Sequence, residues 1–420
     1  MPTPLCFWLQ VTRVSSNQAS MNLISSHPFW SVNNGLPANY PSLKRNVSCD
    51  AVVIGGGITG ALVAVHLAEA GVKTLLIDKR DIGTGSTSAS TALLQYEIDV
   101  PLRELMKKIG LVAATWSYQL CRDAIGKLER LTVRLSIDCG FELRPSLFLA
   151  RHQREIPELR EEFQLRRKMG IELEFYDAPS IQFRFPFSRP AALFSKDGGQ
   201  VDPHRLTHGL LGAGKSLGLE VFDRTKMARL EQTRRGVRIT THNGCQISAR
   251  RAVIAAGFES KTLLNADAGT LKSTYALISE PLPPISRWHQ KCLIWESGTP
   301  YLYLRTTNEG RVIIGGEDET FVNAKRRDAL ISQKTATLLK KFGRLFPGVS
   351  LEVAYAWAGT FGETKDGLPY IGAHPRFPHT YFALGYGGNG ITFSLIAAEI
   401  IRDYFLGRTS RDAHIFRFGR

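Results

Sequence analysis

Cysteine is scarce in this chain and never occurs in closely spaced pairs. The 420 residues include six cysteines, with no CxxC pair among them: Cys6, Cys49, Cys121, Cys139, Cys245 and Cys292. This spacing argues against a dense disulfide framework and against the common zinc-ligand patterns. We therefore expect reduced thiols, a cytoplasmic location and no metal site.

Long apolar runs are also missing. No run reaches the length of about 18 residues that a spanning helix requires, so we predict no transmembrane segment. Residues 5–9 form an early apolar patch, without a preceding basic region or a small-residue cleavage site. This argues against a signal peptide. Because residues 1–20 carry no recognisable pattern, Met21 is an alternative candidate for the start.

Positive charge is in excess, but no nucleic-acid motif accompanies it. The chain has 53 Lys and Arg against 38 Asp and Glu, a formal net charge of +15. The densest basic runs, at residues 160–168 and 325–327, are mixed with acids or spaced as on a helix. We interpret them as solvated helix faces. No zinc-finger or RNA-binding signature is present, and we predict no nucleic-acid partner.

The remaining composition is that of an ordinary globular protein, with 43% hydrophobic and 10% aromatic residues. The length exceeds that of one typical domain, which favours a two-domain or discontinuous-domain enzyme. No oligomeric state follows from these properties.

The strongest local signal is a glycine turn between an apolar strand and a helix. Residues 50–54 predict the strand, GGGITG at residues 55–60 predicts the turn, and residues 61–71 predict the helix. In this motif Gly55 permits the tight turn, Gly57 lets the backbone approach a pyrophosphate, and Gly60 lets the helix pack on the strand. The pattern predicts a bound dinucleotide at the start of the helix.

A second apolar strand at residues 72–77 ends at Asp78, where a carboxylate can accept hydrogen bonds from the ribose hydroxyls. An acid at this position disfavours a 2′-phosphate. Lys79 and Arg80 directly follow Asp78, and their positive charges keep NADP as an alternative cofactor.

Three later segments bear on the choice between NAD and FAD. The first, GSTSAST at residues 85–91, offers N–H and O–H donors for a phosphate or a flavin edge, although a flexible linker has the same composition. The second, RAVIAAG at residues 251–257, is an apolar strand that ends in small residues. The third pairs DGLPYIG at residues 366–372 with GYGGNGI at residues 385–391, a glycine-rich turn that opens a helix.

With these motifs in this order, from about residue 48 to about residue 405, the chain resembles the FAD-dependent D-amino-acid oxidase superfamily, which includes glycine oxidase and sarcosine oxidase. The resemblance implies an α/β fold: a Rossmann-type FAD-binding domain with a discontinuous antiparallel-sheet substrate domain of α+β type. We expect FAD binding at residues 46–95, 197–265 and 351–408, and the substrate domain at residues 96–196 and 266–350. Residues 1–45 would be an N-terminal extension and residues 409–420 a C-terminal tail.

The resemblance also assigns residues to non-covalent FAD. The turn would hold the pyrophosphate, Asp78 the ribose, and the last turn the flavin pyrimidine. The full set is Gly55, Gly57, Ile58, Thr59, Gly60, Asp78, Lys79, Gly85, Ser86, Thr87, Ser88, Met227, Ala256, Gly257, Asp366, Gly388, Asn389, Gly390 and Ile391. Covalent flavin is not expected, because the cysteine used by the sarcosine-oxidase branch falls at about Gly359.

The substrate side departs from the family pattern. Relatives that act on amino acids place an arginine where Phe361 stands, and the sarcosine-oxidase branch places a lysine where Thr392 stands. We therefore propose Arg305 as the replacement cation, with Tyr303 and Phe361 in the substrate pocket. The alternatives are an exposed strand arginine or a structural ion pair for Arg305, and core packing for Tyr303.

Two further positions complete the expectations. The lysine that activates oxygen in the sarcosine-oxidase branch falls near Ile313, which leaves oxygen or an unknown compound as the electron acceptor. His204 and His208 are spaced like a metal pair, but Asp202 and Pro203 before them predict a helix N-cap and first turn instead.

The resulting hypothesis is a FAD-dependent oxidation of a C–N bond in an amine or amino-acid-like substrate. Hydride would pass to flavin N5 and leave an imine that hydrolyses. The alternatives are a flavin dehydrogenase of a hydroxy acid or polyol phosphate, and a FAD-binding module without catalytic activity.

Overall fold

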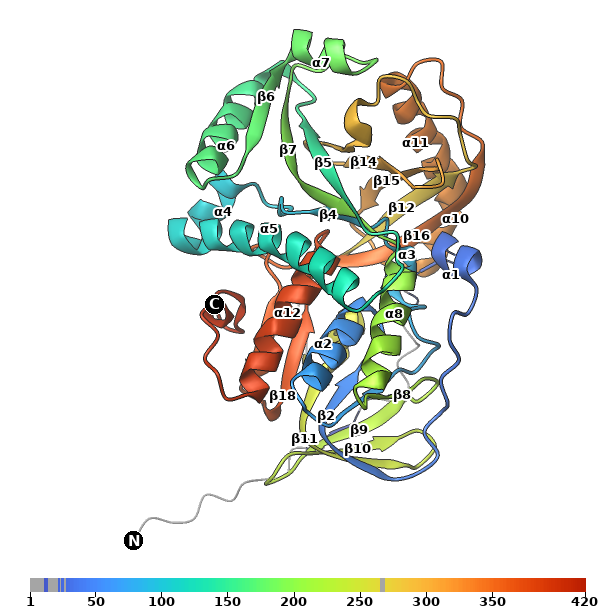
Figure 1. The fold of residues 1–420 in the computed structure, drawn as a ribbon, viewed down its shortest axis with the longest axis vertical. Helices are drawn as coiled ribbons and strands as arrows, with labels where there is room; N and C mark the ends of the chain where they lie inside the picture. Colours follow the sequence, from blue (N-terminus) through green and yellow to red (C-terminus); the bar gives the residue numbers. More distant parts are fainter. Residues whose placement is uncertain (1–10, 14–21, 23, 26–27, 265–268) are drawn as a thin grey trace.

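The computed structural model describes the chain except for residues 1–10, 14–21, 23, 26–27 and 265–268. The early apolar patch, Cys6 and Met21 lie outside the described residues. Two nine-stranded sheets dominate the described part, one in each half of the molecule (Figure 1). The expected α/β fold with a second, mainly antiparallel sheet is confirmed.

The first sheet has parallel strands at its centre, where β11, β2, β3 and β8 follow one another. Along this sheet the strands run in the order β1 (Val11–Arg13), β9 (Met227–Gln232), β10 (Val237–Thr241), β11 (Gln246–Ile254), β2 (Val47–Ile54), β3 (Thr74–Ile77) and β8 (Glu220–Phe222). Beside β11 lies β18 (Phe377–Leu384), which pairs with β17 (Tyr370–His374). Strand β1 pairs with β9 antiparallel, so the expected N-terminal extension adds a strand that its sequence did not predict.

Helices α2 (Ile58–Glu69), α8 (Pro203–Ser216) and α12 (Gly390–Phe405) lie side by side on one face of this sheet (Figure 1). Neighbouring β2 residues are buried on opposite faces: Val53 packs with the α2 core and Val52 with the core on the other side. A central parallel strand is covered on both faces, which explains the continuous apolar run in its sequence.

The second sheet contains the strands β16 (Val353–Glu363), β12 (Thr270–Ser279), β15 (Val312–Glu319), β14 (Leu302–Thr306), β13 (Leu293–Glu296), β5 (Glu142–Leu149), β7 (Ala191–Gln200) and β4 (Leu93–Gln95), in that order. A further strand, β6 (Leu173–Asp177), pairs with β7. The expected hairpin is present, because β14 and β15 pair antiparallel from Leu302 opposite Gly316 to Thr306 opposite Val312.

Further helices flank the second sheet. Helix α11 (Ile331–Leu345) packs against β12, β15 and β16, while α5 (Leu111–Arg134) and α6 (Ile156–Lys168) pack against β7. The short helices are α1 (Phe29–Asn34), α3 (Ser86–Ala89), α4 (Leu102–Ile109), α7 (Ala178–Arg184), α9 (Lys261–Leu264), α10 (Ala324–Ala329) and α13 (Ala413–Phe416). Of these, α13 contacts β17 of the first sheet. Among the described residues, no helix combines the length and the apolar content that crossing a membrane requires.

The boundary expected at residue 351 is displaced in the structure. Strand β16 was assigned to the FAD-binding part, yet it pairs with β12 of the second sheet from Val353 opposite Ser279 to Glu363 opposite Thr270. We expected β16 in the first sheet because it lies close in sequence to the DGLPYIG motif. The chain passes from the second sheet to the first only after Glu363. Strand β4 also belongs to the second sheet.

Candidate functional site

The β2–α2 turn shows why glycine stands at three positions. Gly55 has a φ of +115°, and a Cβ there would lie 2.4 Å from the carbonyl oxygen of Ala255. A Cβ at Gly60 would lie 1.8 Å from the carbonyl oxygen of Gly55, so α2 packs directly on the turn. A Cβ at Gly57 would come within 2.9 Å of the Thr87 hydroxyl. Gly55 and Gly60 thus allow close backbone packing within the turn, and Gly57 leaves the N-terminus of α2 without a side chain beside Thr87.

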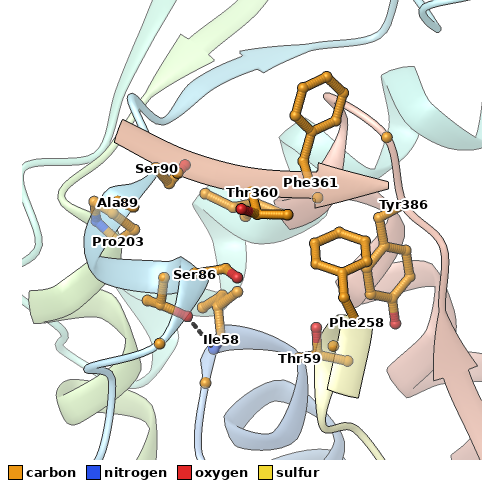
Figure 2. A pocket seen from close by; sticks show the side chains of 18 of the residues that line it. Ile58, Thr59, Ser86, Ala89, Ser90, Pro203, Phe258, Thr360, Phe361 and Tyr386 are labelled. Carbon is orange, nitrogen blue, oxygen red and sulfur yellow. Dashed lines mark hydrogen bonds between the residues drawn. The ribbon is translucent and has the colours of Figure 1, made fainter. Parts of the chain in front are cut away.

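The loop around α3 closes one side of this turn. The backbone N–H of Ile58 donates to the Thr87 hydroxyl at 3.0 Å. The Ser86 side chain is exposed and lines the cavity beside α2, as Figure 2 shows, where it lies close to Ile58. The Ser88 hydroxyl instead donates to the carbonyl of Gly85 at 2.9 Å. Ser88 is therefore a structural residue of the loop and does not line the cavity.

Asp78 supports the glycine turn and lines the same cavity. Its carboxylate accepts hydrogen bonds from the N–H of Gly56 at 2.6 Å and from the N–H of Arg80 at 2.8 Å. Burial raises the pKa of Asp78, while these two N–H groups act in the opposite direction. Lys79 and Arg80, which left NADP open, both pair with Glu259, at 2.7 Å and 2.6 Å. The two cations thus share one carboxylate at this end of the cavity.

The cavity has a volume of about 420 Å³ and is bounded by residues of both sheets. It lies within the range of about 300–1,000 Å³ that is typical of small-molecule sites. It brings together most of the residues predicted for FAD: Gly55, Gly57, Ile58, Thr59, Asp78, Lys79, Gly85, Ser86, Thr87, Met227, Ala256, Gly257, Gly388, Asn389, Gly390 and Ile391. In Figure 2, Thr360 and Phe361 lie on β16, across the cavity from Ile58 and Thr59, and the Phe361 ring points away from these two residues.

Asp366 is not among the lining residues, which corrects its predicted role. Its carboxylate binds the Arg420 guanidinium at 2.7 Å and 2.9 Å, and it also accepts a hydrogen bond from the N–H of Leu368 at 3.1 Å. Asp366 thus joins the turn before β17 to the C-terminal residue. Gly60 does not line the cavity either, because it is covered by the turn that it packs against.

The prediction that Arg305 presents a cation to the substrate is wrong. Its side chain is 2% exposed and donates to the carbonyl of Thr91 at 2.7 Å, to Gln200 Oε1 at 3.2 Å and to the carbonyl of Val201 at 3.2 Å. Burial lowers the pKa of Arg305 to about 9. The guanidinium therefore holds the segment behind the cavity wall through hydrogen bonds to carbonyl and amide oxygens, which is neither the exposed position nor the ion pair that the sequence left as alternatives.

Tyr303 and Phe361 both line the cavity. The Tyr303 ring fits because its cross-strand neighbour is Gly315, where a Cβ would lie 2.3 Å from the ring. Burial raises the pKa of Tyr303 to about 12, so its phenol is protonated at neutral pH. Ile313, at the expected lysine position, is fully buried with Trp357 and does not reach the cavity.

Four carboxylates on the second-sheet side of the cavity were missed by the sequence analysis. We name them the acidic cluster: Glu97, Asp99, Asp318 and Glu363. A signal for two of them was present. From the last residue of β4 onward, the polar residues Gln95, Glu97 and Asp99 alternate with Tyr96 and Ile98, which are buried in the core. A period of two of this kind indicates one polar face.

Burial governs the acid–base properties of this cluster. It raises the pKa of Asp99 to about 6, and the negative charges of Glu363 and Asp318 act in the same direction. Burial also raises the pKa of Glu97 to about 6, against the opposing effect of Arg166, and it raises the pKa of Asp318. The Asp99 carboxylate accepts the N–H of Gly388 at 2.7 Å, which joins the cluster to the turn before α12.

Cations are distributed unevenly along the cavity. Within the described ranges, the lysines and arginines that line it are Lys79, Arg80 and Lys226. All three belong to the nucleotide end, since Lys226 follows Thr225, whose N–H donates to the carbonyl of Asp78 at 2.6 Å. The end formed by the second sheet is therefore acidic and aromatic.

The predicted helix start at Asp202 is confirmed. The Asp202 carboxylate accepts the N–H groups of His204 and Arg205, both at 2.9 Å, and Pro203 occupies the first turn of α8. In the part of the chain that the structure describes, no three histidine, cysteine, aspartate or glutamate side chains are placed so that they could hold one metal ion.

Comparison with known proteins relates this architecture to a family. The family model described as FAD dependent oxidoreductase (DAO) matches residues 50–404. Over 388 residues the chain is 27% identical to glycine oxidase of Bacillus licheniformis, covering 88% of this chain and 96% of that protein. It is also 27% identical over 388 residues to gamma-glutamylputrescine oxidoreductase of Escherichia coli strain K12, covering 89% of this chain and 87% of that protein. The crystal structure of glycine oxidase from Geobacillus kaustophilus matches with a TM-score of 0.75 at 20% identity, covering 89% of this chain and 99% of that chain, which shows a shared fold.

Proposed function

This chain belongs to the family of FAD-dependent oxidoreductases, and we propose that it oxidises a C–N bond of an amine or amino-acid-like substrate. The observation that carries the proposal is the division of one cavity into a nucleotide end and an acidic, aromatic end. An amine is attracted by carboxylates and by the faces of aromatic rings. Two relatives are named for amine-bearing compounds, glycine and gamma-glutamylputrescine.

We assign the FAD cradle to the lining residues of the first sheet. The N-terminus of α2, kept open by Gly57, would hold the pyrophosphate, and Asp78 would hold the ribose. The backbone beside Met227 and Ala256 would border the adenine and the ribityl chain. The turn at Gly390 would offer the N-terminus of α12 to the flavin pyrimidine. Gly55 and Gly57 fit this group, because they line the cavity at the N-terminus of α2 and carry no side chain that would enter it.

When bound, FAD supplies a two-electron acceptor that the side chains lack. It would accept the hydride equivalent that the carbon next to the reacting nitrogen gives up when a C=N bond forms. Water then hydrolyses the imine to a carbonyl compound and a released amine. The chain's own residues orient the substrate between Tyr303 and Phe361 and exclude water. Positioning of this kind, with charge stabilisation, supplies most of the rate in such a site.

The second-sheet end does not favour the hydroxy-acid or polyol-phosphate alternative. An anionic substrate would need a cation there, and Arg305 is engaged behind the wall. Among the described residues that line this end, only carboxylates carry charge. We also propose a cytoplasmic location, on the basis of free thiols at Cys49, Cys121, Cys139, Cys245 and Cys292.

The test is reduction of the bound flavin without oxygen. The purified holoenzyme is mixed anaerobically with a panel of amines, amino acids, hydroxy acids and glycerol phosphate, and the loss of flavin absorbance is recorded. We expect bleaching by amines. Bleaching by hydroxy acids alone would favour the alternative dehydrogenase, and no bleaching by any compound would favour a non-catalytic module. The reduced enzyme is then mixed with air-saturated buffer. Rapid return of the flavin absorbance would identify oxygen as the electron acceptor, and slow return would indicate another acceptor.

A further inference from the structure

The acidic cluster carries more negative charge than the surrounding cations match. Glu363 forms an ion pair with Lys272 at 2.6 Å, and Glu97 forms a longer ion pair with Arg166 at 3.7 Å. For Asp99 and Asp318, no ion pair is found among the described residues. Two carboxylates on the cavity wall thus lack a matching cation.

Unsatisfied oxygen atoms point to a missing donor on the same wall. Glu97 is 5% exposed and lines the cavity, yet its Oε2 has no hydrogen-bond partner among the described residues. The buried Oδ1 of Asp318 is also without one. A buried carboxylate oxygen without a donor destabilises the folded protein, because it has lost its hydrogen bonds to water. A ligand that brings positively charged N–H donors would remove this cost at both residues.

The reacting nitrogen is not suited to this role. It must be uncharged to release its lone pair into the C=N bond, whereas a neighbouring carboxylate stabilises the protonated form of an amine. The acidic cluster would therefore oppose the reaction if it held the nitrogen that is oxidised. It is suited to a second nitrogen that stays protonated throughout.

The aromatic part of the lining fits the same ligand. Trp295, Tyr301, Tyr303 and Phe361 line the second-sheet side of the cavity together with the acids. Ring faces attract ammonium groups and also pack against methylene chains. A chain of methylenes with an ammonium at its far end matches both properties.

We propose that the substrate is a diamine, oxidised at one nitrogen while Asp99 and Asp318 hold the other nitrogen as an ammonium ion. This inference rests on the proposed function, because it names the substrate class of the same site. It also assigns Asp318 as a specificity-determining residue that contacts the part of the substrate that does not react.

The experiment measures anaerobic flavin reduction of the FAD-loaded enzyme by 1,4-diaminobutane, butylamine and 4-aminobutanoate. These compounds share a four-carbon chain and differ at the far end, which is cationic, apolar or anionic. We expect the diamine to bind most tightly and 4-aminobutanoate most weakly. In Asp318→Asn, the Kd of the diamine should rise about ten- to hundredfold, the equivalent of one charged hydrogen bond, and that of butylamine less than about twofold.

Two further variants separate binding from folding. Asp318→Glu keeps the charge and should recover part of the diamine affinity. Glu309→Gln removes an exposed acid at the β14–β15 turn and should leave all three affinities unchanged. Flavin content and melting temperature are recorded for each variant, so that an unfolded protein is recognised.

The outcomes distinguish this inference from the function on which it rests. If the wild type is reduced equally well by butylamine and the diamine, or if Asp318→Asn weakens both alike, the diamine proposal is overturned and amine oxidation stands. If no amine reduces the flavin, the proposed function itself fails. Selective loss of the diamine in Asp318→Asn, with recovery in Asp318→Glu, would support the assignment.

Discussion

Replacing Gly55 by alanine adds one methyl group at the tightest point of the β2–α2 turn. Two costs follow from the structure. A non-glycine residue at a φ of +115° is strained by about 1–2 kcal/mol. The new Cβ would also lie 2.4 Å from the oxygen and 2.7 Å from the carbon of the Ala255 carbonyl, and such overpacking costs about 1–3 kcal/mol. The expected loss of unfolding free energy is therefore about 2–5 kcal/mol.

A matched control separates the two costs. Gly71 follows the end of α2 with a φ of +76°, and nothing lies within 4 Å of a Cβ built there. Gly71→Ala therefore carries the strain without the collision, and we expect a loss of about 1–2 kcal/mol. Because Gly71 is remote from the lining residues, this variant should keep its flavin.

Urea unfolding of the two variants and the wild type gives the difference in free energy, and the flavin released on gel filtration reports cofactor binding. Gly55→Ala should unfold at clearly lower urea than Gly71→Ala and should lose FAD, since the turn shifts away from Ala255. Equal unfolding midpoints and full flavin content in both variants would refute the argument that backbone contact makes glycine necessary at this turn.

Three further predictions concern the acidic end of the cavity and its surroundings. Because burial raises the pKa of Asp99 to about 6, its negative charge is lost as pH falls through that value. The diamine Kd should therefore rise as pH falls over this range, measured in a titration between about pH 5 and 8. Asp99→Asn should reduce this rise but not abolish it, because burial also raises the pKa of Glu97 to about 6. Phe361→Arg places a cation among the lining residues and should weaken amine binding at least about tenfold, measured by flavin reduction; unchanged affinity would show that the ring does not face the substrate. Arg305→Gln removes donors to Thr91 and should lower the melting temperature while leaving the ratio of diamine to butylamine affinity unchanged; a changed ratio would return Arg305 to the substrate site.

The nucleotide half of the site was predictable because its geometry is local. Gly55, Gly57 and Gly60 lie within one strand–turn–helix unit, where spacing along the chain determines which atoms meet. Asp78 closes the next strand, and the parallel pairing of β2 with β3 places it beside the turn. The resemblance added the later motifs in their order.

The substrate half was predicted only in part. Tyr303 and Phe361 were expected from the hairpin and from the position before the DGLPYIG motif, and both line the cavity. Arg305 shares a strand with Tyr303, and alternation along the strand offered no reason to separate them. The Arg305 guanidinium donates hydrogen bonds to backbone carbonyls that are distant in sequence, such as that of Val201.

The sequence by itself determined the fold class, the glycine turn and the choice of cofactor, because these depend on short-range spacing and on the order of motifs. Tertiary structure alone decided which charges face the ligand. Asp99 and Asp318 come to one wall only when the segment after β4 and the end of β15 border the same cavity. Asp366 leaves the cofactor set because folding brings Arg420 to it. Contacts of this kind join residues that are distant in sequence. Periodicity and spacing are local patterns, so they do not show which distant residues come close together in the fold.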